Sequence, residues 1–108
     1  MVSPRRFEVG LCSLDPTVGQ EISKTRPTVV VSPDEANAAV TWYTVAPMTT
    51  GAFAYATRVP VTFDGKSGVI VVDQLRALDR RRLVKRLGVI DMPTQEALLR
   101  TLAAFFAA

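Results

Sequence analysis

Residues 15–32 read DPTVGQEISKTRPTVVVS, and this stretch determines the expected fold. Its first half contains an Asp-Pro dipeptide and, three residues later, a glycine, a combination typical of a turn. After Pro27 the stretch becomes a run of threonine and valine, which favours a β-strand. A polar loop that leads directly into a strand is therefore predicted, and such loops often carry functional side chains.

Three of the charged side chains in this stretch are Glu21, Lys24 and Arg26. By themselves they allow two interpretations. One is a solvated loop with a Glu21–Arg26 ion pair that stabilises the fold by less than about 1 kcal/mol. The other is a site in which one carboxylate and two cations act on an anionic substrate. Composition alone does not decide between them.

Short extended segments occur on both sides of this loop. They are rich in valine, threonine and aromatic residues, and several alternate apolar and polar positions. Pro60 interrupts one segment and places it at the edge of a sheet, since proline cannot donate to a strand ladder. Four or five short strands of this kind predict a small barrel or sandwich. The segments are Phe7–Leu14, Thr28–Val31, Val40–Val45, Thr57–Phe63 and Val69–Val72.

The C-terminal third follows a different period. Its apolar residues recur at helical spacing, and Pro93 suits a first turn that Asp91 or Thr94 would cap. We expect the apolar stripe to pack on the barrel, with a subunit interface as the alternative. A short helical turn is predicted over residues 79–83. The stripe consists of Leu98, Leu99, Leu102, Phe105 and Phe106.

Composition narrows the function classes. The 108 residues are the size of one domain, taken as residues 1–108, and the net charge of +3 favours an anionic partner. With no histidine and one cysteine, the chain excludes a Cys/His zinc site, a histidine-dependent triad and an intrachain disulfide. No signal sequence is found, and no apolar run approaches the roughly 20 residues of a membrane span. We expect a cytoplasmic protein with no membrane partner.

Four sequence blocks resemble the MazF/PemK family of toxin endoribonucleases, and they occur in the family's order. The first is DPTVGQE followed by TRPTVVVS, and the second is APMTTG at residues 46–51. The third is RVPV at residues 58–61, and the fourth is DQLRALDRRRLVKRLGVI at residues 73–90. One block alone would be a weak signal, but four in register over nearly the whole chain are specific.

This resemblance implies a mainly β fold, a small SH3-like barrel of the MazF/PemK/CcdB type with a C-terminal α-helix and a short helical turn. It also implies a homodimer that cleaves single-stranded RNA and a cognate antitoxin, expected to be acidic, that neutralises it. DNA would be contacted only indirectly, through the antitoxin. The family's catalytic glutamate, arginine and threonine correspond to Glu21, Arg26 and Thr49.

Cleavage with these residues needs no metal or other cofactor. The 2′-hydroxyl of the RNA attacks the adjacent phosphate, which gives a 2′,3′-cyclic phosphate and a 5′-hydroxyl. Glu21 would remove the hydroxyl proton, with Asp15 as the other carboxylate in the loop. Arg26 would stabilise the pentacoordinate dianion through its forked guanidinium, and Thr49 would hydrogen-bond to the phosphate.

Further side chains are candidates for RNA binding. Gln74 follows a buried strand and could read a base edge, although a structural amide explains it equally well. The basic run at residues 80–86 is either a solvated face or a surface for phosphate or antitoxin. Trp42 and Tyr43 point to opposite faces of a strand, one of them into the core. The predicted RNA-binding residues are Lys24, Thr50, Phe53, Gln74, Arg80, Arg82 and Arg86.

The loop departs from the family pattern. Ile22, Ser23 and Lys24 stand where the family usually has Gln-x-Gly, so a glycine is lost that would matter at a positive φ. Such changes bear on RNA sequence preference more than on reaction type. Two other functions remain open: a CcdB-like toxin that binds gyrase without nuclease activity, and an inactive relative that only binds antitoxin. Retention of the three catalytic residue types argues against the CcdB-like function.

Overall fold

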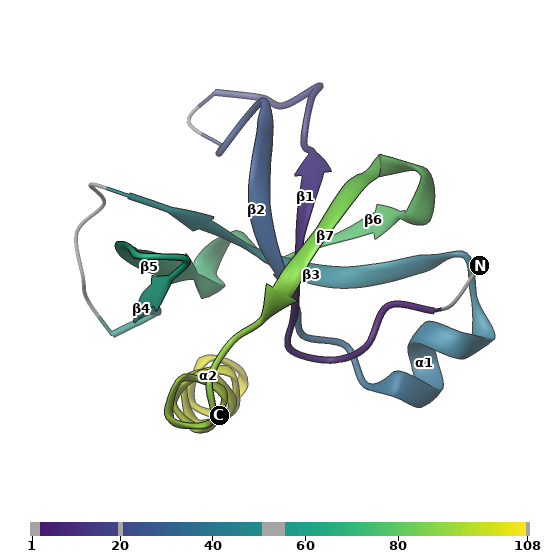
Figure 1. The fold of residues 1–108 in the computed structure, drawn as a ribbon. Coiled ribbons are helices and arrows are strands. Elements are labelled where there is room, and N and C mark those ends of the chain that lie inside the picture. The colour runs from purple at the N-terminus through teal and green to yellow at the C-terminus, as the bar shows by residue number, and fades with distance from the viewer. Residues whose placement is uncertain (1–2, 20, 51–55, 108) are drawn as a thin grey trace.

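The structure is a computed structural model that describes residues 3–19, 21–50 and 56–107. In these ranges the chain forms a curled β-sheet with a long helix packed against it (Figure 1). The helices are α1 (Asp34–Ala39) and α2 (Met92–Phe106), and two short 3₁₀ turns are η1 (Val72–Gln74) and η2 (Arg80–Arg82). The strands are β1 (Glu8–Ser13), β2 (Thr25–Val30), β3 (Trp42–Thr49), β4 (Arg58–Phe63), β5 (Lys66–Val71), β6 (Arg76–Asp79) and β7 (Leu83–Val89).

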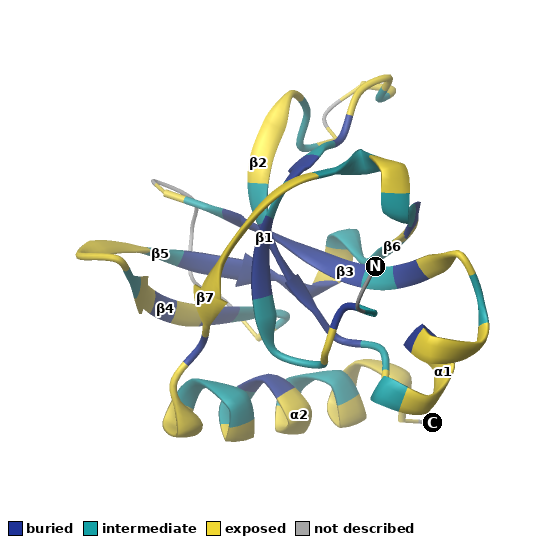
Figure 2. Ribbon diagram, turned by 45° about the vertical axis from the view of Figure 1, so that its right-hand side comes forward, coloured by how far each residue is buried: buried dark blue, intermediate teal, exposed yellow. Residues whose placement is uncertain are grey.

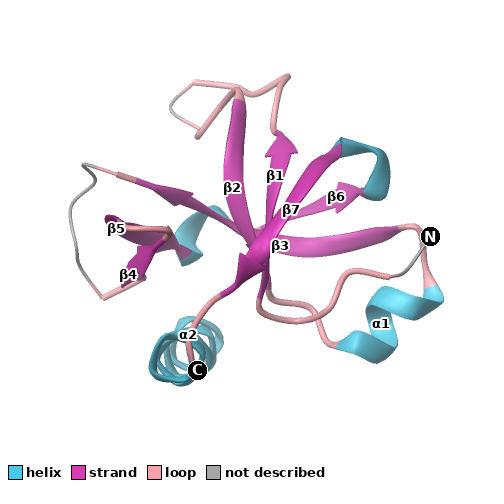
Figure 3. Ribbon diagram, in the orientation of Figure 1, coloured by secondary structure: helices cyan, strands magenta, loops and turns pink. Residues whose placement is uncertain are grey.

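The strands form one antiparallel sheet in the order β4-β5-β3-β2-β1-β7, with β6 as a further partner of β3 (Figure 3). β3 is central because different parts of it pair with three strands. Its first half, from Trp42 to Val45, pairs with β6, and its end at Met48 and Thr49 pairs with β5. The β4 strand ends the order, so the edge position predicted from Pro60 is confirmed.

Two hydrophobic clusters lie on the two faces of this sheet. Much of β1, β3 and β5 is buried (Figure 2). Neighbouring residues of a strand point to opposite faces, so Val29 belongs to one cluster and Val30 to the other. The first cluster includes Leu98 of α2. The second contains Tyr43, whose burial raises the pKa of its hydroxyl, while Trp42 is 54% exposed. The predicted division of these two aromatics between core and surface is therefore confirmed.

Helix α2 begins as expected from the sequence. The Asp91 side chain accepts a hydrogen bond from the Thr94 N–H at 3.0 Å, and that bond lowers the pKa of the carboxyl. Leu98 is fully buried, whereas Phe106 remains 71% exposed. The apolar stripe thus packs on the sheet only in part, and its outer residues still face solvent. In the described part of the chain, no helix has the length and apolar character needed to cross a membrane.

All five extended segments predicted from the sequence overlap strands, and the helical turn over residues 79–83 contains η2. Sequence analysis did not predict α1 or two of the strands. The expected number of four or five strands is therefore corrected to seven in the described ranges. The missed strands, β6 and β7, both lie in the fourth sequence block, residues 73–90. Six of the seven β7 residues are exposed, so apolar alternation does not mark this strand.

Candidate functional site

The β1–β2 loop (residues 14–24) is closed by hydrogen bonds at its two ends. The Leu14 N–H donates to the Lys24 carbonyl at 2.9 Å, and the Lys24 N–H donates to Asp15 Oδ1 at 3.0 Å. Lys24 has φ 68°, in the left-handed region that glycine adopts most easily. The positive φ considered for the lost glycine is therefore present here, and Asp15 helps hold Lys24 in it.

Side chains from the segment after β5 anchor this loop to the sheet. Gln74 Oε1 accepts a hydrogen bond from the Ile22 N–H at 2.8 Å. Arg76 donates to the Leu14 carbonyl at 3.1 Å, and Arg82 donates to the carbonyl of the last residue of β1 at 3.3 Å. The Ile22 side chain also packs against the second hydrophobic cluster. The loop is thus fixed at its base and near Glu21.

Glu21 lies at an exposed turn within the loop. Its Oε1 accepts a hydrogen bond from the Val18 N–H at 2.6 Å, and its own N–H donates to the Val18 carbonyl at 3.3 Å. Beside this turn is a cavity of about 380 Å³, named here the loop groove. Its walls include Glu21, Pro47, Asp73, Gln74 and Arg76.

Arg26 and Thr49 are brought together by strand register. The ladder between β2 and β3 ends at Thr28 and Pro47, and Arg26 and Thr49, each two residues further along, line one cavity. The Arg26 Nε–H donates to the Ser23 carbonyl at 3.3 Å, which ties the guanidinium to the loop. Two of the three predicted catalytic residues therefore lie at the same end of the β2–β3 pair.

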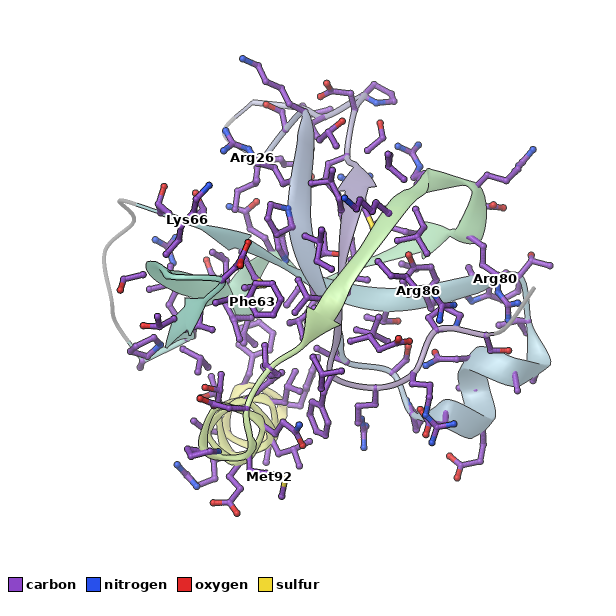
Figure 4. All side chains as sticks on the ribbon, viewed as in Figure 1. Arg26, Phe63, Lys66, Arg80, Arg86 and Met92 are labelled. Carbon is purple, nitrogen blue, oxygen red and sulfur yellow. The ribbon has the colours of Figure 1, made fainter. Side chains whose placement is uncertain are left out.

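Both residues line a second cavity of about 390 Å³, named here the hairpin groove because the β4–β5 hairpin forms one wall. The groove also contains Thr50, whose backbone carbonyl accepts the Thr49 hydroxyl at 3.3 Å. Phe63 and Lys66 of the hairpin line it too, and sequence analysis missed both (Figure 4). The only sequence signal for these two residues was their position beside a tight Asp-Gly turn. Such a turn indicates a hairpin but does not show which surface the hairpin faces.

Glu21 and Arg26 line different grooves, separated by the ends of β2 and β3. Among the described residues no hydrogen bond or ion pair joins them. The interpretation of this loop as a simple Glu–Arg pair is therefore wrong. The arrangement instead presents a carboxylate on one side of the strand ends and a guanidinium with a hydroxyl on the other.

Asp73 is a second carboxylate at the loop groove. It accepts hydrogen bonds from the Thr57 hydroxyl at 3.1 Å and from the Arg58 guanidinium at 3.4 Å. Partial burial raises the pKa of Asp73, but these bonds and one from the backbone outweigh burial, so its pKa lies below the ordinary value. In the described ranges, no three Cys, Asp or Glu side chains gather as metal ligands would.

The arginines of the basic run at residues 80–86 have different contacts. Arg80 donates to the carbonyls of Asn37 and Val40, so its guanidinium fastens α1 to the sheet and a structural role explains it. Arg82 holds the loop base, and Arg86 forms an ion pair with Glu8 at 3.5 Å. None of these three lines the loop groove or the hairpin groove. The remaining predicted RNA-binding aromatic, Phe53, lies outside the described residues.

Comparison with known proteins identifies the family of this chain. The sequence pattern of the family described as "PemK-like, MazF-like toxin of type II toxin-antitoxin system" matches residues 5–106. The chain belongs to this toxin family. The resemblance seen in the four sequence blocks is thereby confirmed, and so is the mainly β fold class that it implied.

Similar MazF and PemK proteins support the assignment. Endoribonuclease PemK of Escherichia coli is 38% identical over 81 residues, an alignment that covers 70% of this chain and 61% of that protein. MazF from Deinococcus radiodurans has the same fold with a TM-score of 0.83 at 26% identity, covering 95% of this chain and 96% of that one. A mycobacterial endoribonuclease solved with its cognate antitoxin has the same fold with a TM-score of 0.80 at 21% identity. The match covers 94% of this chain and 93% of that one.

Proposed function

We propose that this toxin is an endoribonuclease that cleaves single-stranded RNA through Glu21, Arg26 and Thr49. The observation that carries the proposal is the hairpin groove that Arg26 and Thr49 line together, with the anchored Glu21 loop close by in sequence. The 38% identity to a protein named an endoribonuclease supports the same activity. In this proposal the substrate spans both grooves, and its reacting phosphate lies over the strand ends between them.

In the proposed reaction the RNA supplies its own nucleophile. Glu21 takes the proton of the 2′-hydroxyl, whose oxygen forms a bond to the adjacent phosphorus while the bond to the 5′-oxygen breaks. The leaving oxygen takes up a proton from water. The products are a 2′,3′-cyclic phosphate and a 5′-hydroxyl, and no metal ion or cofactor takes part.

The present contacts of Glu21 are compatible with this role. One carboxylate oxygen accepts the Val18 N–H at 2.6 Å. A carboxylate has about four lone-pair positions on its two oxygens, so it can keep that bond and still receive a proton. The backbone hydrogen bond aims the carboxylate, and the loop anchors limit how far it moves.

Arg26 and Thr49 act on the phosphate in this account. The guanidinium is a rigid fork that holds two phosphate oxygens, and it keeps its charge at neutral pH. It therefore stabilises the pentacoordinate dianion electrostatically and does not serve as the proton donor. The Thr49 hydroxyl, which now donates to the Thr50 carbonyl, turns to donate to a phosphate oxygen.

The partners follow from charge and from relatives. With a net charge of +3, the toxin is expected to bind an acidic antitoxin segment that covers Arg26. A mycobacterial relative was solved with its cognate antitoxin, which supports such a complex. We further propose a cytoplasmic homodimer that contacts DNA only through the antitoxin. The alternatives are a CcdB-like gyrase-binding toxin and an inactive antitoxin-binding relative.

A cleavage assay separates these functions. Purified toxin is incubated with generic single-stranded RNA in excess EDTA, and the ends of the products are analysed. We expect cleavage with cyclic phosphate ends, and no cleavage of the same strand when each ribose lacks its 2′-hydroxyl. Intact RNA together with inhibited gyrase supercoiling would establish the CcdB-like function. Intact RNA with normal gyrase activity would leave the inactive relative.

A further inference from the structure

The hairpin groove contains more chemistry than the proposed reaction uses. Arg26, Thr49 and Thr50 form one part of its wall, but Phe63 and Lys66 stand on the β4–β5 hairpin across from them. These two residues pair across the hairpin, where Phe63 is opposite Lys66. An aromatic ring and a cation are thus held side by side in the same cavity as the residues assigned to the phosphate.

Phe63 is held in place by its neighbours. Its side chain is half-buried and packs against the first hydrophobic cluster. The ring tip lies against Gly88 of β7, where an added Cβ would come within 3.1 Å of Phe63 Cζ. Gly88 also has φ 152°, which side chains rarely adopt. The absence of a side chain at Gly88 therefore leaves space for the ring, and packing presets its position.

Lys66 brings a second cation to the groove. With Arg26 it gives two positive charges against one carboxylate, Asp64, in a cavity of about 390 Å³ (Figure 4). Asp64 and Gly65 have φ 52° and 76°, a tight turn that sets the hairpin tip. A cavity of this size is in the range of small-ligand sites. Cations, hydroxyls and an aromatic side chain are the groups that bind single-stranded nucleic acid.

We propose that the hairpin groove binds the nucleotide next to the cleaved phosphate, with the base against Phe63 and its phosphate on Lys66. Asp64 accepts hydrogen bonds from base N–H groups. The proposal rests on the function proposed above and names residues that select the substrate. RNA is favoured over a protein segment because the groove includes Arg26 and Thr49, the residues assigned to the phosphate, and because two cations and two threonines stand among its apolar residues.

Binding measurements test the two contacts separately. The probe is a short random-sequence RNA with 2′-fluoro riboses, which cannot be cleaved by this route, and affinity is measured at several salt concentrations. Lys66→Gln is expected to make the slope of log K against log salt shallower by about 0.7, the value for one phosphate on a single strand. Arg100→Gln is the control, an exposed cation on α2 that lines neither groove and is expected to leave the slope unchanged.

The ring is tested through sequence preference. Phe63→Leu keeps an apolar side chain against Gly88 but removes the stacking face, and we expect affinity to fall about tenfold. Sequencing the ends of a cleaved RNA pool should show relaxed base preference at one position beside the cut. Thermal unfolding of the same variant establishes whether the fold is kept, and Phe63→Tyr, which retains the ring, should retain the preference.

Defined outcomes would overturn the proposal. The groove does not bind this nucleotide if two results are found together while the wild type cleaves RNA. The first is that Lys66→Gln binds RNA with the salt slope of the wild type. The second is that Phe63→Tyr and Phe63→Leu show the same base preference beside the cut. If these variants instead lose only antitoxin binding, the groove is a protein-docking site. If the wild type neither cleaves nor binds RNA, the proposed function fails first, and this result is distinct from the other two.

Discussion

The Gln74 side-chain carbonyl accepts the Ile22 N–H at 2.8 Å across 52 positions of sequence. This bond joins the turn after β5 to the residue that follows Glu21. Two residues beyond Gln74, Arg76 holds the Leu14 carbonyl at the base of the same loop. The carboxylate proposed as the base therefore owes its position to side chains that lie far from it in sequence.

We expect Gln74 to position the loop and not to read RNA. Gln74→Met keeps the length and removes the acceptor, so an Ile22 N–H near the loop groove is left without its partner. A hydrogen bond of this kind is worth about 1 kcal/mol, and we expect kcat to fall about fivefold with KM nearly unchanged. The cleaved sequences of an RNA pool should stay the same. A changed base preference with normal kcat would assign Gln74 to base reading instead.

Lys24 should have opposite effects on stability and on RNA binding. At φ 68° a lysine is strained, so Lys24→Gly is expected to stabilise the fold by about 0.5–1 kcal/mol in urea unfolding. The same change removes a cation from the loop and should make the salt slope of RNA binding shallower. Lys24→Asn, which tolerates this φ, should also lose the cation but gain less stability. Lower stability of Lys24→Gly would contradict this account of the loop.

Stability at low pH should depend on Asp73. Its folded pKa lies below the ordinary value, so its ionised form stabilises the fold above about pH 4, and this contribution is lost as pH falls through the folded pKa. Asp73→Asn should therefore be less stable than the wild type at pH 7, by under about 1 kcal/mol because solvent screens the pair. Urea unfolding at pH 7 and at a pH below the folded pKa should show that the stability difference between variant and wild type vanishes in acid. A constant difference would exclude titration of Asp73 as its cause.

The exposed apolar residues of β7 and α2 predict self-association. Val89 is 56% exposed on the last strand of the sheet order, and Phe106 is 71% exposed on α2. Light scattering at micromolar concentration should give twice the 11.8 kDa chain mass. Val89→Lys should shift the mass toward the monomer. Val18→Lys, at an 81% exposed valine of the loop, should not. A monomeric wild type would contradict the prediction.

The part of the fold that follows apolar periodicity could be predicted from the sequence. Alternation marked the strand around Val59 and Val61, and helical spacing with the Asp91 cap marked α2. The strand β7 was not predicted, because it pairs with β1 through backbone hydrogen bonds while its side chains are almost all exposed. Exposed basic residues are as typical of a solvated loop as of an edge strand.

The candidate site was predictable to the same degree. The resemblance to the MazF/PemK family pointed to Glu21, Arg26 and Thr49, but a sequence resemblance cannot tell that Glu21 and Arg26 line different grooves. Phe63 and Lys66 were missed because only the curl of the sheet brings the hairpin beside β2. Such neighbours come from long-range packing, which leaves no local pattern in the sequence.

Arg26 tests the nature of phosphate stabilisation. Arg26→Lys keeps the charge but loses the rigid fork, so a large loss of kcat with little change in RNA affinity would favour two-pronged binding of the transition state. The side chain is exposed and its one described hydrogen bond goes to the Ser23 carbonyl, so little stability should be lost. If Arg26→Lys cleaves as fast as the wild type, simple charge attraction is sufficient.

The central claim is that Glu21 removes the proton of the 2′-hydroxyl, and Glu21→Gln measures it most directly. The variant keeps the side-chain shape and an oxygen for the Val18 N–H, so it should fold and bind RNA like the wild type. Its single-turnover cleavage rate should be lower by about 10²–10⁴. Glu35→Gln, an exposed carboxylate on α1, should cleave normally. A folded Glu21→Gln toxin that cuts RNA at the wild-type rate would contradict the account and move the base to another carboxylate.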